Sequence, residues 1–176
     1  MTSRFARAAI ALAAMAIGCR ASGPPNQGKT NTMDSLAGKL VIKSTHITSS
    51  EGLEVNIELT NQGSSAVQIP SGNPFSFRAI VRDGRGATVA PTLQRLDVLS
   101  KTTWVRAEPG KPTTVSATIK PEAGYQLDTT TQVWRLPAGK YEFAGRFIVE
   151  AKADGAPGDA WSGAIDLAPV AFEILP

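Results

Sequence analysis

Apolar and polar residues alternate along most of the chain after residue 38. The clearest run is 53–60, in which leucine, valine and isoleucine fill the odd positions and charged or polar residues fill the even ones. A period of two places one face of a β-strand against a core and the other face in water. These features predict an all-β fold of seven or more short strands. The alternation recurs at 67–69, 75–81, 115–119, 141–149 and 170–174.

Turn-forming residues separate most of these runs. Residues 83–89 (Asp-Gly-Arg-Gly-Ala-Thr-Val) predict a hairpin, and Pro109 with Gly110 predicts another turn. Only 92–100, with leucine at positions 93, 96 and 99, is compatible with either a helical turn or a bent strand. Short antiparallel strands joined in this way predict a two-sheet β-sandwich over residues 39–176.

The first residues have the layout of an export signal. Arg4 and Arg7 precede ten apolar residues at 8–17, and Gly18 and Cys19 follow. Ten apolar residues are too few to cross a bilayer, which takes roughly 20. Cys19 is the only cysteine, so an exported form has no disulfide framework and depends on its hydrophobic core for stability.

The segment Ala16-Ile-Gly-Cys19 resembles the lipobox of bacterial lipoproteins. The resemblance implies removal of residues 1–18 and attachment of membrane lipid to Cys19. Arg20, in a place where aspartate favours the inner membrane, implies the outer membrane of the cell envelope by the same resemblance. An ordinary signal peptide cut after Ala21 is the alternative, and it would yield a soluble periplasmic or secreted protein.

Residues 19–38 follow as a polar segment that contains only two large apolar side chains. Such a segment cannot offset the entropy of ordering itself, so it is interpreted as a flexible tether between the lipid and the domain. Two of the 18 basic residues lie in the signal, which leaves 16 basic against 15 acidic side chains afterwards. A nearly neutral chain without a basic cluster does not favour a nucleic-acid partner.

The run Leu136-Pro-Ala-Gly139-Lys-Tyr141 resembles the Leu-x-x-Gly-x-Tyr motif of immunoglobulin-like and fibronectin-like sandwiches. In those domains the tyrosine hydroxyl bonds back to the connecting backbone, which is called a tyrosine corner. The resemblance implies this role for Tyr141, with Leu136 and Gly139 as part of the corner. The strand that follows, 141–150, would pair with a final strand at 169–175.

Five segments together are similar in order to landmarks of the bacterial intracellular proteinase inhibitor domain and its exported relatives. The resemblance implies an immunoglobulin-like sandwich more strongly than it implies inhibition, because the segments are mostly turns. An inhibitory segment would be exposed, and the best candidate is 69–74, which contains Pro70, Ser71 and Asn73; the alternative is a plain turn between strands. The segments are 53–61, 71–77, 82–86, 108–110 and 137–141.

Catalytic and metal-binding patterns are absent from the sequence. His46 is the only histidine, and it is expected to face solvent on a strand. Glu54 and Glu58 share a strand face but lie about 13 Å apart, so they are expected to form a solvated face. Residues 154–159, with Asp166, are an alternative calcium site, although they lack the alternating oxygen ligands of a calcium loop. We predict no catalytic residue, no cofactor, no resident metal and no enzyme activity.

The three tryptophans are Trp104, Trp134 and Trp161. Core packing is the first interpretation of each, and a platform that stacks a sugar ring is the alternative. The sequence therefore predicts a non-catalytic binding or structural module at the cell envelope, with an envelope protein or polymer as partner. The alternatives are a protease inhibitor and a carbohydrate- or calcium-binding module.

Overall fold

The computed structural model describes residues 36–71, 76–95, 102–120, 124–151 and 155–176. The predicted signal, Cys19, most of the predicted tether, Asn73 and Asp154 lie outside these ranges. The described residues form twelve strands and no helix, so the all-β prediction is confirmed. The first six strands are β1 (Leu36–Ile42), β2 (His46–Thr48), β3 (Val55–Asn61), β4 (Val67–Ser71), β5 (Phe77–Asp83) and β6 (Leu93–Gln94). The others are β7 (Thr103–Ala107), β8 (Pro112–Ser116), β9 (Leu127–Asp128), β10 (Gln132–Trp134), β11 (Gly139–Val149) and β12 (Gly163–Leu175).

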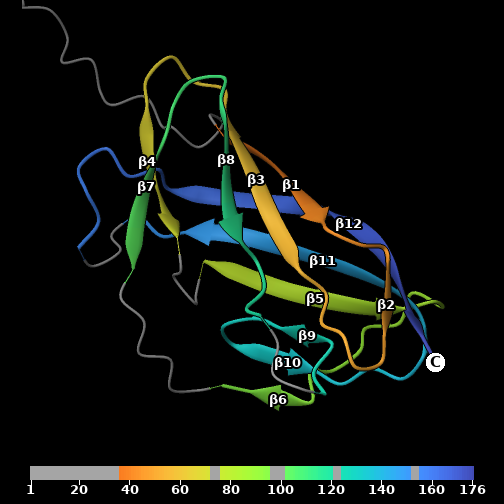
Figure 1. The fold of residues 1–176 in the computed structure, drawn as a ribbon. Helices are drawn as coiled ribbons and strands as arrows, with labels where there is room; N and C mark the ends of the chain where they lie inside the picture. The colour runs from red at the N-terminus through yellow and green to blue at the C-terminus, as the bar shows by residue number, and fades with distance from the viewer. Residues whose placement is uncertain (1–35, 72–75, 96–101, 121–123, 152–154) are drawn as a thin grey trace, which may run out of the picture. The chain divides into compact units, whose positions relative to one another are not determined.

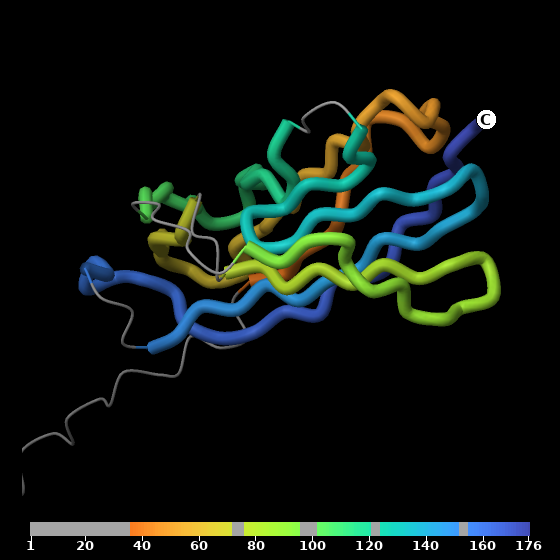
Figure 2. Tube along the Cα trace, turned by 90° about the horizontal axis from the view of Figure 1, so that it is seen from below, coloured from red at the N-terminus to blue at the C-terminus, as the bar shows by residue number. Residues whose placement is uncertain are grey.

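The strands of the described residues form four sheets (Figure 1). One sheet has the order β1-β3-β8 and another has the order β2-β12-β11-β5. Two smaller sheets have the orders β6-β10-β9 and β4-β7. Every pair of strands is antiparallel except β2 and β12, which run parallel. Figure 2 shows β5, β11 and β12 side by side along their length, with the end of β12 beside β2.

One hydrophobic core joins the sheets, and the period-two runs supply most of it. Leu53, Val55, Ile57 and Leu59 are all buried, as the alternation predicts. The odd residues of β11 from Tyr141 to Val149 face the same core, and its even residues face away. The other strands contribute in the same way, and their core members include Leu40, Val67, Ile69, Phe77, Val81, Ala107, Val115, Leu127, Leu167, Phe172 and Ile174.

The last strand is longer than its alternation predicts. β12 starts at Gly163, six residues before the expected 169–175, and it pairs with β11 throughout. The register passes from Phe143 opposite Val170 to Gly145 opposite Leu167, so two residues of β12 oppose one residue of β11. This β-bulge contains Pro169, which has no N–H to donate to a ladder. Because of the extra residue, the core-facing positions of β12 are odd-numbered before the bulge and even-numbered after it. The first half of the strand therefore does not continue the alternation at 170–174 and is not recognisable from it.

Gly145 allows β11 and β5 to pack closely at this position. A Cβ atom on residue 145 would overlap the Phe77 ring and would lie 2.8 Å from the backbone oxygen of Arg78. Both approaches are closer than any van der Waals contact, so only glycine fits here. The Phe77 ring fills that space and lies 5.8 Å from the Phe143 ring, between centroids.

The predicted turns are present. Asp83 and Gly86 close the hairpin after β5 through a 2.8 Å hydrogen bond, and the Val89 amide donates back to Val81. Gly110 has a φ of 69°, in the left-handed region that favours glycine, and its amide donates to the Asn61 carbonyl. Within 92–100, Leu93–Gln94 form the short strand β6, and 96–100 lie outside the described residues.

The hydrogen bond predicted for Tyr141 is present at the start of β11. The Tyr141 hydroxyl donates to the carbonyl oxygen of Pro137 at 2.9 Å, and Leu136 beside it is buried. Burial raises the pKa of Tyr141, and the negative charge of Asp83 adds to this effect. The bond ties the start of β11 to the connection that precedes it.

We expect Tyr141→Phe to lower the free energy of unfolding by about 1 kcal/mol, because the Pro137 carbonyl loses its partner. The raised pKa also means that the unfolded chain loses this proton first, so the wild type loses stability as the pH rises from about 10. The phenylalanine variant lacks this contribution. Urea unfolding of both proteins between pH 8 and pH 11 measures the difference, and parallel pH profiles would contradict the assignment.

Candidate functional site

A hollow of about 550 Å³ opens beside β2 and the turn that follows it. Its floor is apolar, because Ile47 and Leu53 belong to the core, and its rim carries charged and hydroxyl groups. A volume of this size is in the range of small-molecule sites. The residues that line it are Lys43, Ser44, His46, Ile47, Ser50, Glu51, Gly52, Leu53, Glu54 and Lys120.

The two carboxylates of the hollow already have partners in the fold. Glu51 accepts hydrogen bonds from the backbone amide of Thr48 at 2.7 Å and from its hydroxyl at 2.9 Å. These bonds lower the pKa of Glu51, the backbone bond more than the hydroxyl bond. Glu54 forms an ion pair with Lys43 at 3.3 Å. The rim is therefore electrically balanced and shows no strong preference for an anion or a cation.

His46 faces solvent on β2, as its place in the sequence predicts. Its Nδ1 atom lies 3.0 Å from the Thr45 hydroxyl, and its Nε2 atom lies 3.7 Å from a carboxylate oxygen of Glu173. A hydroxyl, an imidazole and a carboxylate in this order are the components of a nucleophile and its base. However, 3.7 Å exceeds hydrogen-bond length, and the imidazole is 61% exposed. The arrangement does not position His46 as a base.

Two binding candidates from separate parts of the sequence meet on the β4-β7 sheet, which we call the β4–β7 ribbon. Pro70 on β4 lies directly opposite Trp104 on β7, and Ser71 lies opposite Thr103. The Thr103 hydroxyl donates to the Ser71 carbonyl at 2.6 Å and fixes this end of the ribbon. Trp104 is only partly buried. The ribbon thus holds a partly buried indole opposite a buried proline on a pair of hydrogen-bonded strands.

The other two tryptophans belong to the core. Trp161 and Trp134 are among the largest fully buried side chains. The Trp134 indole N–H donates to the Val89 carbonyl at 3.1 Å, and the Trp161 ring stacks on Phe147. Neither ring has a face available to stack a sugar, so the platform interpretation does not hold for these two residues.

The candidate inhibitory segment is not a loop along its whole length. Ile69 and Pro70 are buried and Ser71, the last residue of β4, pairs with Thr103 of β7, whereas residues 72–74 lie outside the described residues. An inhibitory segment must present an exposed backbone to a protease. Residues 69–71 therefore belong to the framework of the ribbon.

The carboxylates examined in the sequence form surface ion pairs. Glu58 pairs with Lys39 at 2.8 Å and Glu54 pairs with Lys43, which agrees with a solvated face. Asp166 pairs with Arg146 at 3.3 Å on β11. Among the residues that the structure describes, no three His, Cys, Asp or Glu side chains gather closely enough to hold a metal ion.

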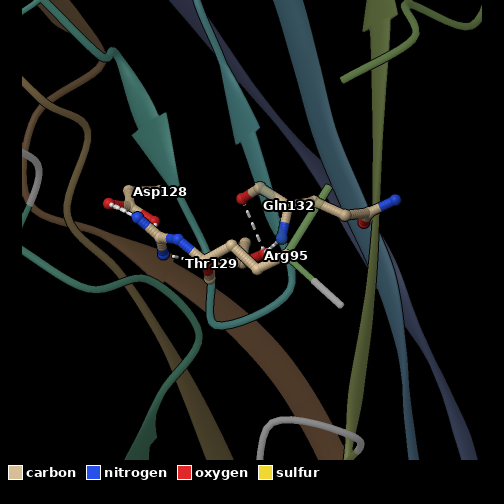
Figure 3. Close-up of polar contacts among 4 residues, drawn as sticks. All are labelled: Arg95, Asp128, Thr129 and Gln132. Atoms are coloured by element: carbon tan, nitrogen blue, oxygen red, sulfur yellow. Dashed lines mark hydrogen bonds and ion pairs between the residues drawn. The ribbon is translucent and has the colours of Figure 1, made fainter. Parts of the chain in front are cut away.

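A partly buried ion pair that no sequence pattern indicated joins Arg95, directly after β6, to Asp128 of β9 (Figure 3). The Arg95 guanidinium donates to both carboxylate oxygens of Asp128, at 2.5 Å and 2.9 Å, and to the Thr129 carbonyl at 3.0 Å. Thr129 then closes a tight turn onto Gln132 through its amide and its hydroxyl. Both carboxylate oxygens are occupied by the guanidinium, so the cluster is suited to holding strands together and not to binding a ligand.

No protein-family model matches the chain, and a search of curated proteins found no match. Among solved structures, the chain is similar to a β-glucosidase from Erythrobacter marinus, with a TM-score of 0.36 and 16% identity. The match covers 76% of this chain and 15% of that chain, so the present chain spans a small part of the length of the glucosidase. In the described residues, no helix has the length and hydropathy needed to cross a bilayer.

Proposed function

We propose that this chain is a lipid-anchored module of the bacterial cell envelope that binds a protein or polymer partner and catalyses no reaction. The observation that carries the binding role is the meeting of Trp104 and Pro70 on the β4–β7 ribbon. A partly exposed indole on a rigid strand pair offers a large contact area at a low entropic cost. The anchor rests on the signal-like residues 1–18 and on the lipobox-like segment that ends at Cys19.

We also propose that the described domain is an immunoglobulin-like sandwich. In that fold the first, second and fifth strands share one sheet, and the third, sixth and seventh strands share the other. Assigning β1, β3 and β8 to the first set and β5, β11 and β12 to the second reproduces both strand orders. The Tyr141 hydroxyl bond supports the same assignment, because it lies at the start of β11, the sixth strand.

Two variants of the full chain test the anchor and the ribbon separately. Cys19→Ser is expected to abolish labelling by a fatty-acid analogue and to release the chain from the membrane fraction. Equal labelling of both chains would contradict the anchor. Trp104→Ala is expected to keep the label and to retain at least tenfold less of the specific partner from solubilised envelope.

The control for the second measurement is Val41→Ala, which removes an exposed apolar side chain from β1, on a different sheet. This variant is expected to retain the partner as the wild type does. If wild type, Trp104→Ala and Val41→Ala all retain the same proteins, or none retains a specific partner, the ribbon is not the binding surface.

A further inference from the structure

The outward side of the β2-β12-β11-β5 sheet, which we call the open face, has an apolar centre. Its side chains are the even residues of β5 and β11 and their register partners on β12, since the odd residues of β11 fill the core. Ile80 is 37% exposed there and lies directly opposite Ala144, which is buried, and Ile148 lies opposite Ala164. An apolar centre with charges around it is the anatomy of a protein interface.

The corresponding side of the β1-β3-β8 sheet also carries charged, hydroxyl and apolar side chains. Its outward residues include Lys39, Glu58 and Thr114, and also the exposed apolar side chain of Val41. The Lys39–Glu58 ion pair is part of this solvated surface.

We call a set of register partners across the open face a row. In two rows, the residues of β11 and β12 carry opposite charges. The outward residues of β11 in these rows are basic, Lys140 and Arg146. Directly opposite them on β12 are two acidic residues, because the register pairs Lys140 with Glu173 and Arg146 with Asp166. On β5, Arg82 lies opposite Glu142, the other outward charge of β11, and Arg78 lies opposite Arg146, so the basic side of the Arg146 row extends onto β5. In both rows the surface therefore changes sign across the line that divides β11 from β12.

This arrangement is self-complementary. A two-fold axis that lies in the interface and runs along the line between β11 and β12 places β11 of one copy over β12 of the other. Residues of the same row then meet, so Arg146 faces Asp166 and Lys140 faces Glu173, each pair twice. The apolar rows meet at the same time, since residue 148 faces residue 164. Two sheets pack face to face at about 10 Å, a distance that these side chains can span.

We propose that a second copy of this chain docks on the open face and forms a two-fold symmetric dimer. The β11 strand is 11 residues long. At about 3.3 Å per residue and about 4.8 Å between the four strands, the face offers roughly 500 Å² per copy. A total of about 1,000 Å² is near the lower limit for a specific interface, so the dimer is weak and reversible.

A charge-reversal experiment on the full chain, purified in mild detergent, tests the dimer by sedimentation velocity at concentrations of about 1–100 µM. Arg146→Asp and Asp166→Arg each place like charges across the interface, and each is expected to weaken association at least tenfold. In an equimolar mixture of these two variants, a mixed dimer again has opposite charges at both contacts between positions 146 and 166. Association in the mixture is expected to return to within about threefold of the wild type.

The mixture separates the interface from a purely internal role of the ion pair, because the pair within each chain stays broken while association returns. Arg146 and Asp166 are 53% and 82% exposed, so both variants are expected to fold and to melt near the wild-type temperature. Thr114→Glu, on the other sheet, is the control and leaves association unchanged. A wild type that is monomeric at the highest concentration, or a mixture that stays as monomeric as its components, overturns the proposal. Ala171 lies on β12 opposite Glu142, on the open face. If the wild type is monomeric and retains another envelope protein that the Ala171→Arg variant fails to retain, the proposal is also overturned.

Discussion

Replacing Trp161 by alanine is expected to lower the free energy of unfolding by about 3–5 kcal/mol, the range for deleting a large buried aromatic side chain. The indole is 0% exposed and stacks on Phe147 with 6.2 Å between ring centroids. Its backbone is fixed to β4, because its amide donates to the Gln68 carbonyl at 2.9 Å. Because this backbone is held in place, the surrounding residues cannot move in to fill the cavity that the alanine variant would leave. Circular dichroism should show a thermal midpoint lowered by roughly 10–15 °C.

Trp104→Ala is the matched control for this prediction. Trp104 is only partly buried, at the edge of the core, so its truncation is expected to cost less than that of Trp161, about 2 kcal/mol. The difference between the two variants distinguishes a tryptophan that fills the core from one that is available to a partner. If Trp104→Ala unfolds the chain as readily as Trp161→Ala, Trp104 is a packing residue and the proposed role of the β4–β7 ribbon fails.

Local patterns predicted the parts of the fold that depend on neighbouring residues. The alternation at 53–59 places four side chains in the core because a strand reverses its face at every residue. The Tyr141 hydroxyl bond spans four residues, so the motif that contains both partners was sufficient to predict it. The alternation failed in β12, where the bulge shifts the core positions from Ile165 and Leu167 to Val170 and Phe172.

The candidate sites depend on contacts between distant residues, which no local pattern contains. Pro70 and Trp104 were separate candidates until the register of β4 with β7 placed them opposite each other. The hollow draws its lining from the turn after β2 and from Lys120, which lies far along the chain. The parallel pairing of β2 with β12 joins the two ends of the domain in the same way. Such contacts arise from sheet topology, which alternation does not specify.

Arg95→Ala is the second substitution with a large expected effect, because it removes the guanidinium that holds a buried carboxylate. The Asp128 side chain is 3% exposed, and Arg95 donates to both of its oxygens. A buried charge left without its partner costs about 3–5 kcal/mol. Arg135→Ala, which removes an exposed guanidinium 4.5 Å from the centre of the Tyr125 ring, is the control, with an expected cost of about 1 kcal/mol or less.

The double variant Arg95→Met, Asp128→Leu distinguishes the cost of an unpaired charge from the loss of a needed contact. Apolar pairs of similar volume often replace buried ion pairs without loss, so we expect the double variant to regain most of the stability that Arg95→Ala loses. Urea unfolding of the wild type, the single variant and the double variant measures this. If the double variant is as unstable as Arg95→Ala, the ion pair itself holds β6. That outcome has a structural basis, because Leu93 of this two-residue strand is 48% exposed and β6 has little apolar burial to hold it.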